Sequence, residues 1–149
     1  MAFTKVQHGV FRASGSSTTM AVSLTGVTAG NLIAIMCGAE GAASITATGS
    51  DGTSDLVIGT VSNLTSHSAF LAWLLSANGG NKTYTLTMSS AETFRNLVAI
   101  EFAHAGTVLA GQANIGAVDG TTITSGNIST AGTTDLVVAG HYQIGRAHV

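Results

Sequence analysis

Few residues in this sequence are of types and spacings that could support metal binding. The loop 49–55, Gly-Ser-Asp-Gly-Thr-Ser-Asp, places Asp51 and Asp55 close together among small residues. Oxygen ligands at short spacing suit Ca²⁺, but a calcium loop of the EF-hand type needs further acidic positions and a bidentate glutamate, which this loop lacks. Asp51 and Asp55 are therefore candidate metal ligands, and an ordinary solvated turn is the favoured interpretation.

Histidine, serine and cysteine form no recognisable catalytic motif. The histidines outside the last six residues lie far apart in the sequence, at His8, His67, His104 and His141. No Gly-x-Ser-x-Gly elbow is present. The single cysteine, Cys37, follows the apolar run 32–36, where we expect it to pack as a small buried hydrophobe. The sequence therefore predicts no enzyme, no metal and no cofactor, and a Ser-His-Asp hydrolase ranks as a third hypothesis.

Aromatic side chains offer a different kind of site, because sugar rings stack on exposed aromatic faces. The candidates are Trp73, Tyr84 and Tyr142. Trp73 lies within the apolar run 69–75, which favours a place in the core. Tyr84 stands between two threonines, which favours exposure. A glycan platform needs at least two of these rings on one surface.

The composition describes a nearly neutral, hydroxyl-rich chain. Only 8% of its 149 residues are charged, against roughly 25% in globular proteins. Lysine and arginine total 5 and are scattered, so we expect no nucleic-acid partner. The 45% of hydrophobic residues suffice for one core, and no apolar run approaches the roughly 18 residues of a membrane span. No secretory signal peptide is visible at the N-terminus.

Alternating apolar and polar residues predict strands throughout the chain. The expected strands are 4–12, 18–24, 32–37, a short one around Ile45, 56–61, 69–75, 82–88, 94–105 and 135–142, with weaker ones at 107–109, 115–118 and 121–128. Their spacing is typical of an all-β sandwich or barrel, and no stretch shows sustained helical periodicity. The run 32–37 is apolar on both faces, as in a central strand that is covered on each side.

Two more detailed predictions concern the arrangement of these strands. The stretch 94–105 is expected to be a central strand whose larger side chains, Val98, Ile100 and Phe102, meet a second sheet. The Asn-Gly-Gly-Asn turn at 78–81 is expected to close a hairpin over residues 69–88, since these residue types tolerate positive φ.

The last six residues, 144–149, match the translation of a common sequencing-adapter sequence codon by codon. We therefore expect a single natural domain over 1–143, incomplete at its C-terminus, followed by an adapter-derived tail. The source is then expected to be an assembled metagenomic sequence.

From Gly26 to Tyr142 the order of features resembles jelly-roll-like β-sandwich modules of phage structural proteins and bacterial surface proteins. The segments that carry the resemblance are 30–35 (Gly-Asn-Leu-Ile-Ala-Ile), 70–73 (Phe-Leu-Ala-Trp), 84–87 (Tyr-Thr-Leu-Thr), 98–102 (Val-Ala-Ile-Glu-Phe) and 134–140 (Thr-Asp-Leu-Val-Val-Ala-Gly). The resemblance implies an antiparallel two-sheet sandwich, jelly-roll-like and C-terminally truncated. It supplies no catalytic residues.

These observations lead to two main functional hypotheses. The first is a non-enzymatic structural or attachment module of a virion or cell surface, with copies of itself, other surface proteins or a glycan as partners. A phage protein assembles in the cytoplasm and needs no signal peptide, which fits the N-terminus. The alternative is a carbohydrate-binding domain of a secreted protein, which predicts an exposed aromatic row.

Overall fold

The computed structural model describes residues 3–41, 45–49, 57–63, 67–75 and 77–105, together with Leu136 and Val138. Within these residues the chain forms eight strands and no helix. The strands are β1 (Phe3–Ala13), β2 (Ser17–Val27), β3 (Leu32–Glu40), β4 (Ile45–Gly49), β5 (Val57–Asn63), β6 (His67–Leu74), β7 (Gly80–Glu92) and β8 (Arg95–His104). Each lies where the alternation predicted a strand. The predicted strands beyond residue 105 fall outside the described residues, except that Leu136 and Val138 are half-buried and belong to no strand.

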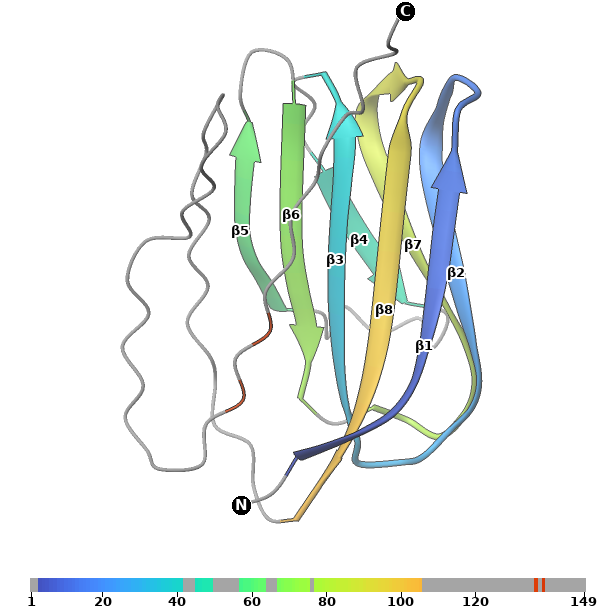
Figure 1. The fold of residues 1–149 in the computed structure, drawn as a ribbon, viewed down its shortest axis with the longest axis vertical. Coiled ribbons are helices and arrows are strands. Elements are labelled where there is room, and N and C mark those ends of the chain that lie inside the picture. Colours follow the sequence, from blue (N-terminus) through green and yellow to red (C-terminus); the bar gives the residue numbers. More distant parts are fainter. Residues whose placement is uncertain are drawn as a thin grey trace, which may run out of the picture.

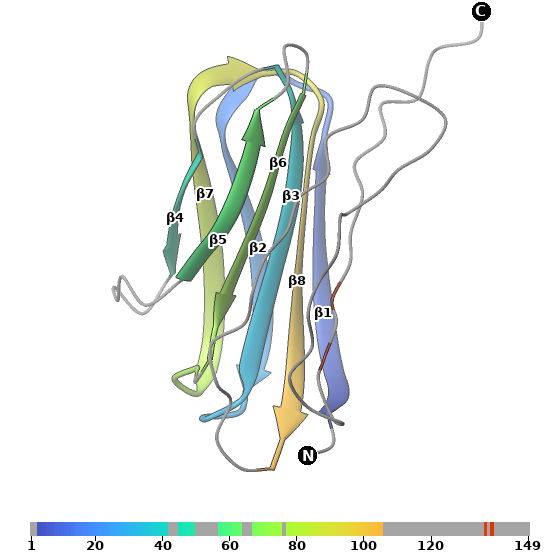
Figure 2. The same cartoon turned by 90° about the vertical axis from the view of Figure 1, so that its left-hand side faces the viewer.

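The strands form two antiparallel sheets that lie face to face (Figures 1 and 2). Sheet A has five strands in the order β1-β8-β3-β6-β5, and sheet B has three in the order β2-β7-β4. The predicted all-β, two-sheet sandwich is therefore confirmed. Among the described residues there is also no helix of the length and apolarity that crossing a membrane requires.

The pairing follows the jelly-roll pattern. β1 pairs with β8, β2 with β7 and β3 with β6, so the chain resembles one long hairpin wound around the sandwich. Within each sheet these strand pairs then join side by side, because β3 also pairs with β8 and β4 pairs with β7. One departure occurs, because β5 joins sheet A beside β6 and does not extend sheet B beside β4. The architecture is therefore jelly-roll-like, as the resemblance implied.

β8 is a central strand, as predicted, but its two faces are the reverse of the prediction. Leu97, Ala99 and Glu101 are fully buried between the sheets. Val98, Ile100 and Phe102 are half-buried on the outer face of sheet A. The prediction assigned the larger side chains to the core. It chose the wrong face because this central strand carries apolar residues on both faces. The burial of Glu101 is possible only because hydrogen-bond donors from distant segments meet its carboxylate.

The predicted hairpin over 69–88 is wrong. β6 belongs to sheet A and β7 to sheet B, so the connection between them crosses from one layer to the other. Gly80 does adopt positive φ, at 100°, as the turn residues suggested. The N–H of Ala77 donates to the carbonyl of Asn31 at 2.9 Å, and the N–H of Gly30 donates to the carbonyl of Ala77 at 2.9 Å. The connection is therefore held by the neighbouring β2–β3 turn, which local sequence cannot reveal.

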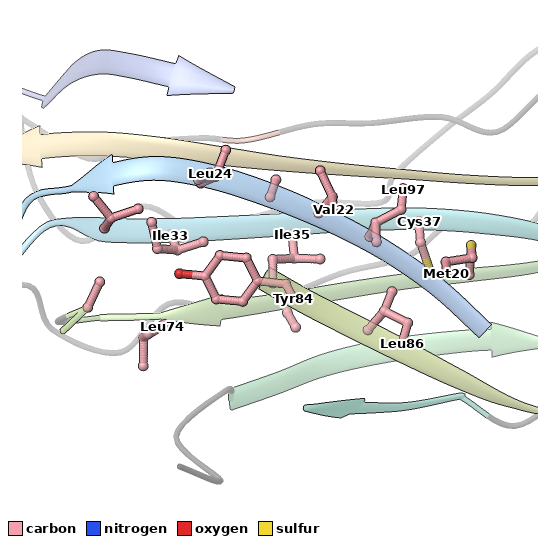
Figure 3. Packing of buried hydrophobic residues seen from close by; sticks show 14 of the residues in the cluster. Met20, Val22, Leu24, Ile33, Ile35, Cys37, Leu74, Tyr84, Leu86 and Leu97 are labelled. Atoms are coloured by element: carbon pink, nitrogen blue, oxygen red, sulfur yellow. The ribbon is translucent and has the colours of Figure 1, made fainter. Parts of the chain in front are cut away.

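The core fills the space between the sheets (Figure 3). Its larger members are Met20, Val22, Leu24, Ile33, Ile35, Cys37, Leu74, Tyr84, Leu86, Met88 and Leu97. β3 supplies buried residues on both faces, which confirms that the run 32–37 is a covered central strand. At Gly9 a Cβ would stand 2.6 Å from Val22 Cγ2 and 2.9 Å from the carbonyl oxygen of Ser23. Glycine therefore allows β1 to lie directly against β2.

Candidate functional site

The most concentrated polar chemistry in the described residues surrounds Glu101, whose side chain is 0% exposed. The carboxylate Oε1 accepts hydrogen bonds from the Thr28 N–H at 2.9 Å and from Asn31 Nδ2 at 2.6 Å. Oε2 accepts one from Gln7 Nε2 at 2.6 Å, and the same amide also donates to the Thr25 carbonyl at 3.0 Å. This Glu101 network joins β8, β1 and the β2–β3 turn at one end of the sandwich.

The electrostatics of the Glu101 network favour a structural role. Burial by itself raises the pKa of Glu101. The hydrogen bonds from Thr28, Gln7 and Asn31 lower the pKa by more than burial raises it, so the pKa lies below its usual value. The group stays ionised at neutral pH and is shielded from solvent, whereas a general acid needs a raised pKa and access to substrate. The carboxylate therefore holds the β2–β3 turn against the sheets.

A second buried charge lies at the other end of β8. Arg95 Nη2 donates to the carbonyl of Gly15 at 2.6 Å, and Nη1 donates to the carbonyl of Thr19. The guanidinium also lies over the ring of Phe11, with Cζ 5.6 Å from the centroid. These contacts tie β8 to the β1–β2 connection. Arg95, like Glu101, is used by the fold.

The described cysteine and histidine side chains, which could act as nucleophiles or metal ligands, are those of Cys37, His8 and His104. Cys37 is buried as predicted, and burial raises the pKa of its thiol to about 12, so it carries no thiolate at neutral pH. His8 is exposed on β1, while the ring of His104 lies 5.8 Å from that of Phe3. Within the described residues no three histidine, cysteine or acidic side chains gather into a possible metal site. The side chains of His67 and His141, and the candidates Asp51 and Asp55, lie outside the described residues.

Trp73 and Tyr84, the two described members of the predicted aromatic platform, do not share a surface. Tyr84 is 0% exposed and its ring points into the core (Figure 3), so the expectation that it is exposed is wrong. Trp73 is half-buried, while its neighbours Ala72 and Leu74 on β6 are buried. Trp73 therefore faces outward from sheet A, and Tyr84 faces inward from sheet B. Tyr142 lies outside the described residues.

The outer face of sheet B is covered by hydroxyls and small side chains. Thr19, Ala21, Ser23 and Thr25 are exposed along β2. Directly across, β7 presents threonines, and the hydroxyls of Ser23 and Thr83 lie 2.9 Å apart. This face is uncharged along both strands. It resembles the polar outer side that an antiparallel sheet normally turns to water.

The outer face of sheet A is apolar by comparison. It carries half-buried side chains on three adjoining strands, namely Val98, Ile100 and Phe102 on β8, Met36 on β3, and Leu71 and Trp73 on β6. Leu32 and Ala34 of β3 lie on the same face and are buried. The edge strand β1 adds Val6 and Val10, which are 49% and 50% exposed. Contiguous apolar side chains on an outer face are typical of surfaces that make contact with another molecule or segment.

Sequence reasoning missed the roles of Glu101 and Arg95. Glu101 is a lone charge within an apolar strand, and Arg95 begins that strand after the exposed Phe94. A single charge in a run that also looks central is a usable signal, because such a charge must find partners if it faces inward. The partners themselves come from β1 and from the β2–β3 turn.

Comparison with known proteins brings no further information on the site. Neither a protein-family model, nor a curated protein, nor a solved structure matches this chain. The arguments about function therefore start from the described residues alone.

Proposed function

We propose that this chain is a non-enzymatic structural or attachment module of a virion or cell surface. The observation that carries the proposal is the apolar outer face of sheet A, which contrasts with the hydroxyl-covered face of sheet B. A sandwich whose two outer faces differ in this way is suited to contact on one side and solvent on the other. Fold-level analogy adds support, because jelly rolls are common in capsid proteins and lectins.

The buried ionisable groups are consistent with this proposal. Glu101 and Arg95 bond to the chain's own turns, and the thiol of Cys37 is neutral. Each is used for folding, which leaves them unavailable for proton transfer or nucleophilic attack. Few surface charges oppose association, so copies of the chain or other surface proteins are suitable partners.

Sedimentation velocity over a wide concentration series tests the proposal. We expect association that rises with concentration and weakens when Val98 and Ile100 are both replaced by threonine, which keeps the β-branched shape and removes apolar surface. Thr25→Val on the opposite outer face is the matched control and should change nothing. A monomer at every concentration that also binds no cell or particle surface contradicts the proposal, as does saturable turnover of ester or glycoside substrates.

A carbohydrate-binding domain is the second candidate, because Trp73 faces outward from sheet A and is half-buried. A partly exposed indole beside a hydroxyl-rich chain can stack on a sugar ring. On an immobilised-glycan array, Trp73→Ala should abolish binding and Trp73→Phe should retain part of it. Equal binding by the wild type and both variants would exclude Trp73 as the sugar contact.

A further inference from the structure

Strand β1 forms one edge of sheet A. β1 pairs with β8 on one side, and no other described strand pairs with it on the other. Alternate residues of an edge strand direct their N–H and C=O groups away from the sheet. From Gln7 to Ala13 the register with β8 is regular, so this part of the edge is straight enough to template another strand.

The exposed side chains of β1 alternate with those that it gives to the fold. Gly9 and Phe11 face inward, where Phe11 packs against the core. His8, Val10 and Arg12 face outward and are exposed, and Val6 precedes them on the same face. The outer side of this strand is therefore an apolar and basic stripe.

The formal charges on this stripe are all positive. Within the described residues, the lysines and arginines are Lys5, Arg12, Lys82 and Arg95, and the last two are buried. Both exposed cations therefore lie on β1, near its two ends, and β1 contains no carboxylate. No ion pair within the described part of the chain engages Lys5 or Arg12. An occupant of this edge is favoured if it brings negative charge.

A second copy of β1 does not satisfy this requirement. Any pairing of β1 with itself brings two further cations and no carboxylate to the same face, and like charges close together across strands are destabilising. A charge that only protects an edge from aggregation would serve best at the middle of the strand. Here the outward residues between the two cations are Val6, His8 and Val10, and the formal charges of Lys5 and Arg12 flank them. Two cations that flank apolar residues are suited to bind a partner of opposite charge as well as to discourage aggregation of the edge.

We propose that the β1 edge receives an extended acidic segment of a partner protein by strand addition. The segment carries an apolar residue beside Val10 and a carboxylate two positions away on the same face, beside Arg12, because side chains on one face recur at every second residue. Main-chain hydrogen bonds supply the affinity, and the Arg12 and Lys5 charges select the sequence. This inference rests on the proposed function and names the partner's chemistry.

Fluorescence anisotropy with synthetic peptides tests the inference on the full chain. The probe is a labelled Thr-Glu-Thr-Val-Thr-Glu-Thr peptide, and a peptide with lysine in place of glutamate is its charge-swapped counterpart. We expect the acidic peptide to bind and Arg12→Glu to weaken it by about fivefold, since an exposed pair is exchanged for a repulsion. The same variant should gain affinity for the lysine peptide. Ala21→Glu on the outer face of sheet B is the control and should leave both affinities unchanged.

An acidic peptide that is N-methylated on the amides of one edge separates strand addition from adsorption by charge. Methylation removes main-chain donors and keeps the side chains, so strand addition requires the methylated peptide to lose its binding. Equal binding of both peptides would overturn the inference, and so would a preference of the Arg12 face for a sulfated polysaccharide or for anionic lipid vesicles. Failure of every peptide to bind would also overturn it. If concentration-dependent association persists in that case, the proposed function stands without strand addition, whereas catalytic turnover would remove both.

Discussion

The two ends of β8 each bury a charged side chain, yet the two charges are satisfied in different ways. At one end, both oxygens of Glu101 accept hydrogen bonds, from the backbone of Thr28 and from the amides of Gln7 and Asn31. At the other end, Arg95 donates to the carbonyls of Gly15 and Thr19, but its Nε finds no partner among the described residues.

The two charges differ in sign because the backbone groups near them differ: the N–H of Thr28 donates at one end, and two carbonyl groups accept at the other. A tight turn between strands, such as Thr28 to Asn31, presents N–H groups, which a carboxylate accepts. The β1–β2 connection at Gly15 and the start of β2 at Thr19 present carbonyls, which a guanidinium fork can reach. The sign of each buried charge therefore matches the backbone groups around it, and Glu101 is more completely hydrogen-bonded than Arg95.

The largest expected effect follows from Glu101→Leu. This change removes the acceptor shared by the Thr28 N–H and by the amides of Gln7 and Asn31, and it leaves the buried Asn31 amide without that partner, so we expect a loss of about 3 kcal/mol in the free energy of unfolding. Chemical denaturation monitored by circular dichroism measures it. Glu101→Gln is the conservative control, because it keeps one acceptor oxygen and should lose less. Equal losses for both variants would mean that shape matters here and hydrogen bonding does not.

Arg95→Met should have the next largest effect, at about 2 kcal/mol, because two hydrogen bonds to carbonyls disappear while an unsatisfied Nε is removed as well. The same denaturation experiment applies. Arg95→Lys retains the charge but cannot donate to both carbonyls through a fork, so it should recover only part of the loss. If Arg95→Met proves more damaging than Glu101→Leu, the ranking of the two ends is wrong.

Gly9 lies midway between the two ends, opposite Ala99, and tests packing without charge. Gly9→Ala introduces a Cβ at 2.6 Å from Val22 Cγ2 and 2.9 Å from the Ser23 carbonyl oxygen, which forces the sheets apart. We expect a loss of about 1 to 2 kcal/mol. Gly15→Ala is the matched control, since its Cβ would meet nothing within 4 Å, and thermal unfolding should leave it near the wild type.

The smallest expected effect is a pH dependence that belongs to the Glu101 end alone. The folded pKa of Glu101 is below its ordinary value of 4.5, so between the two values the unfolded chain binds more protons and stability rises with pH. This contribution is complete above pH 4.5 and is lost as the pH falls through the folded pKa. The wild type should therefore lose stability on acidification relative to Glu101→Gln. Parallel profiles for the two proteins would contradict the assignment of a lowered pKa.

The fold class and the approximate positions of the described strands could be predicted from local sequence patterns. Period-two alternation identified strands such as β2 and β7, and the apolar run 32–37 marked a covered central strand, because these patterns reflect local geometry and burial. Composition likewise indicated a neutral, hydroxyl-rich surface, which the outer face of sheet B displays. The burial of Cys37 also followed from its apolar neighbours.

Which face of each strand packs in the core, and which strands are neighbours, depends on tertiary contacts that local sequence does not contain. Tyr84 is buried because its side of β7 faces sheet A, and Trp73 faces outward because its side of β6 faces away from sheet B, whereas their local sequences suggested the reverse. The hairpin that the turn residues suggested between them does not form, because β6 and β7 belong to different sheets. Glu101 faces inward because Gln7 and Asn31, distant in sequence, supply its donors. Such choices depend on contacts between segments far apart in the chain, so no local pattern can encode them.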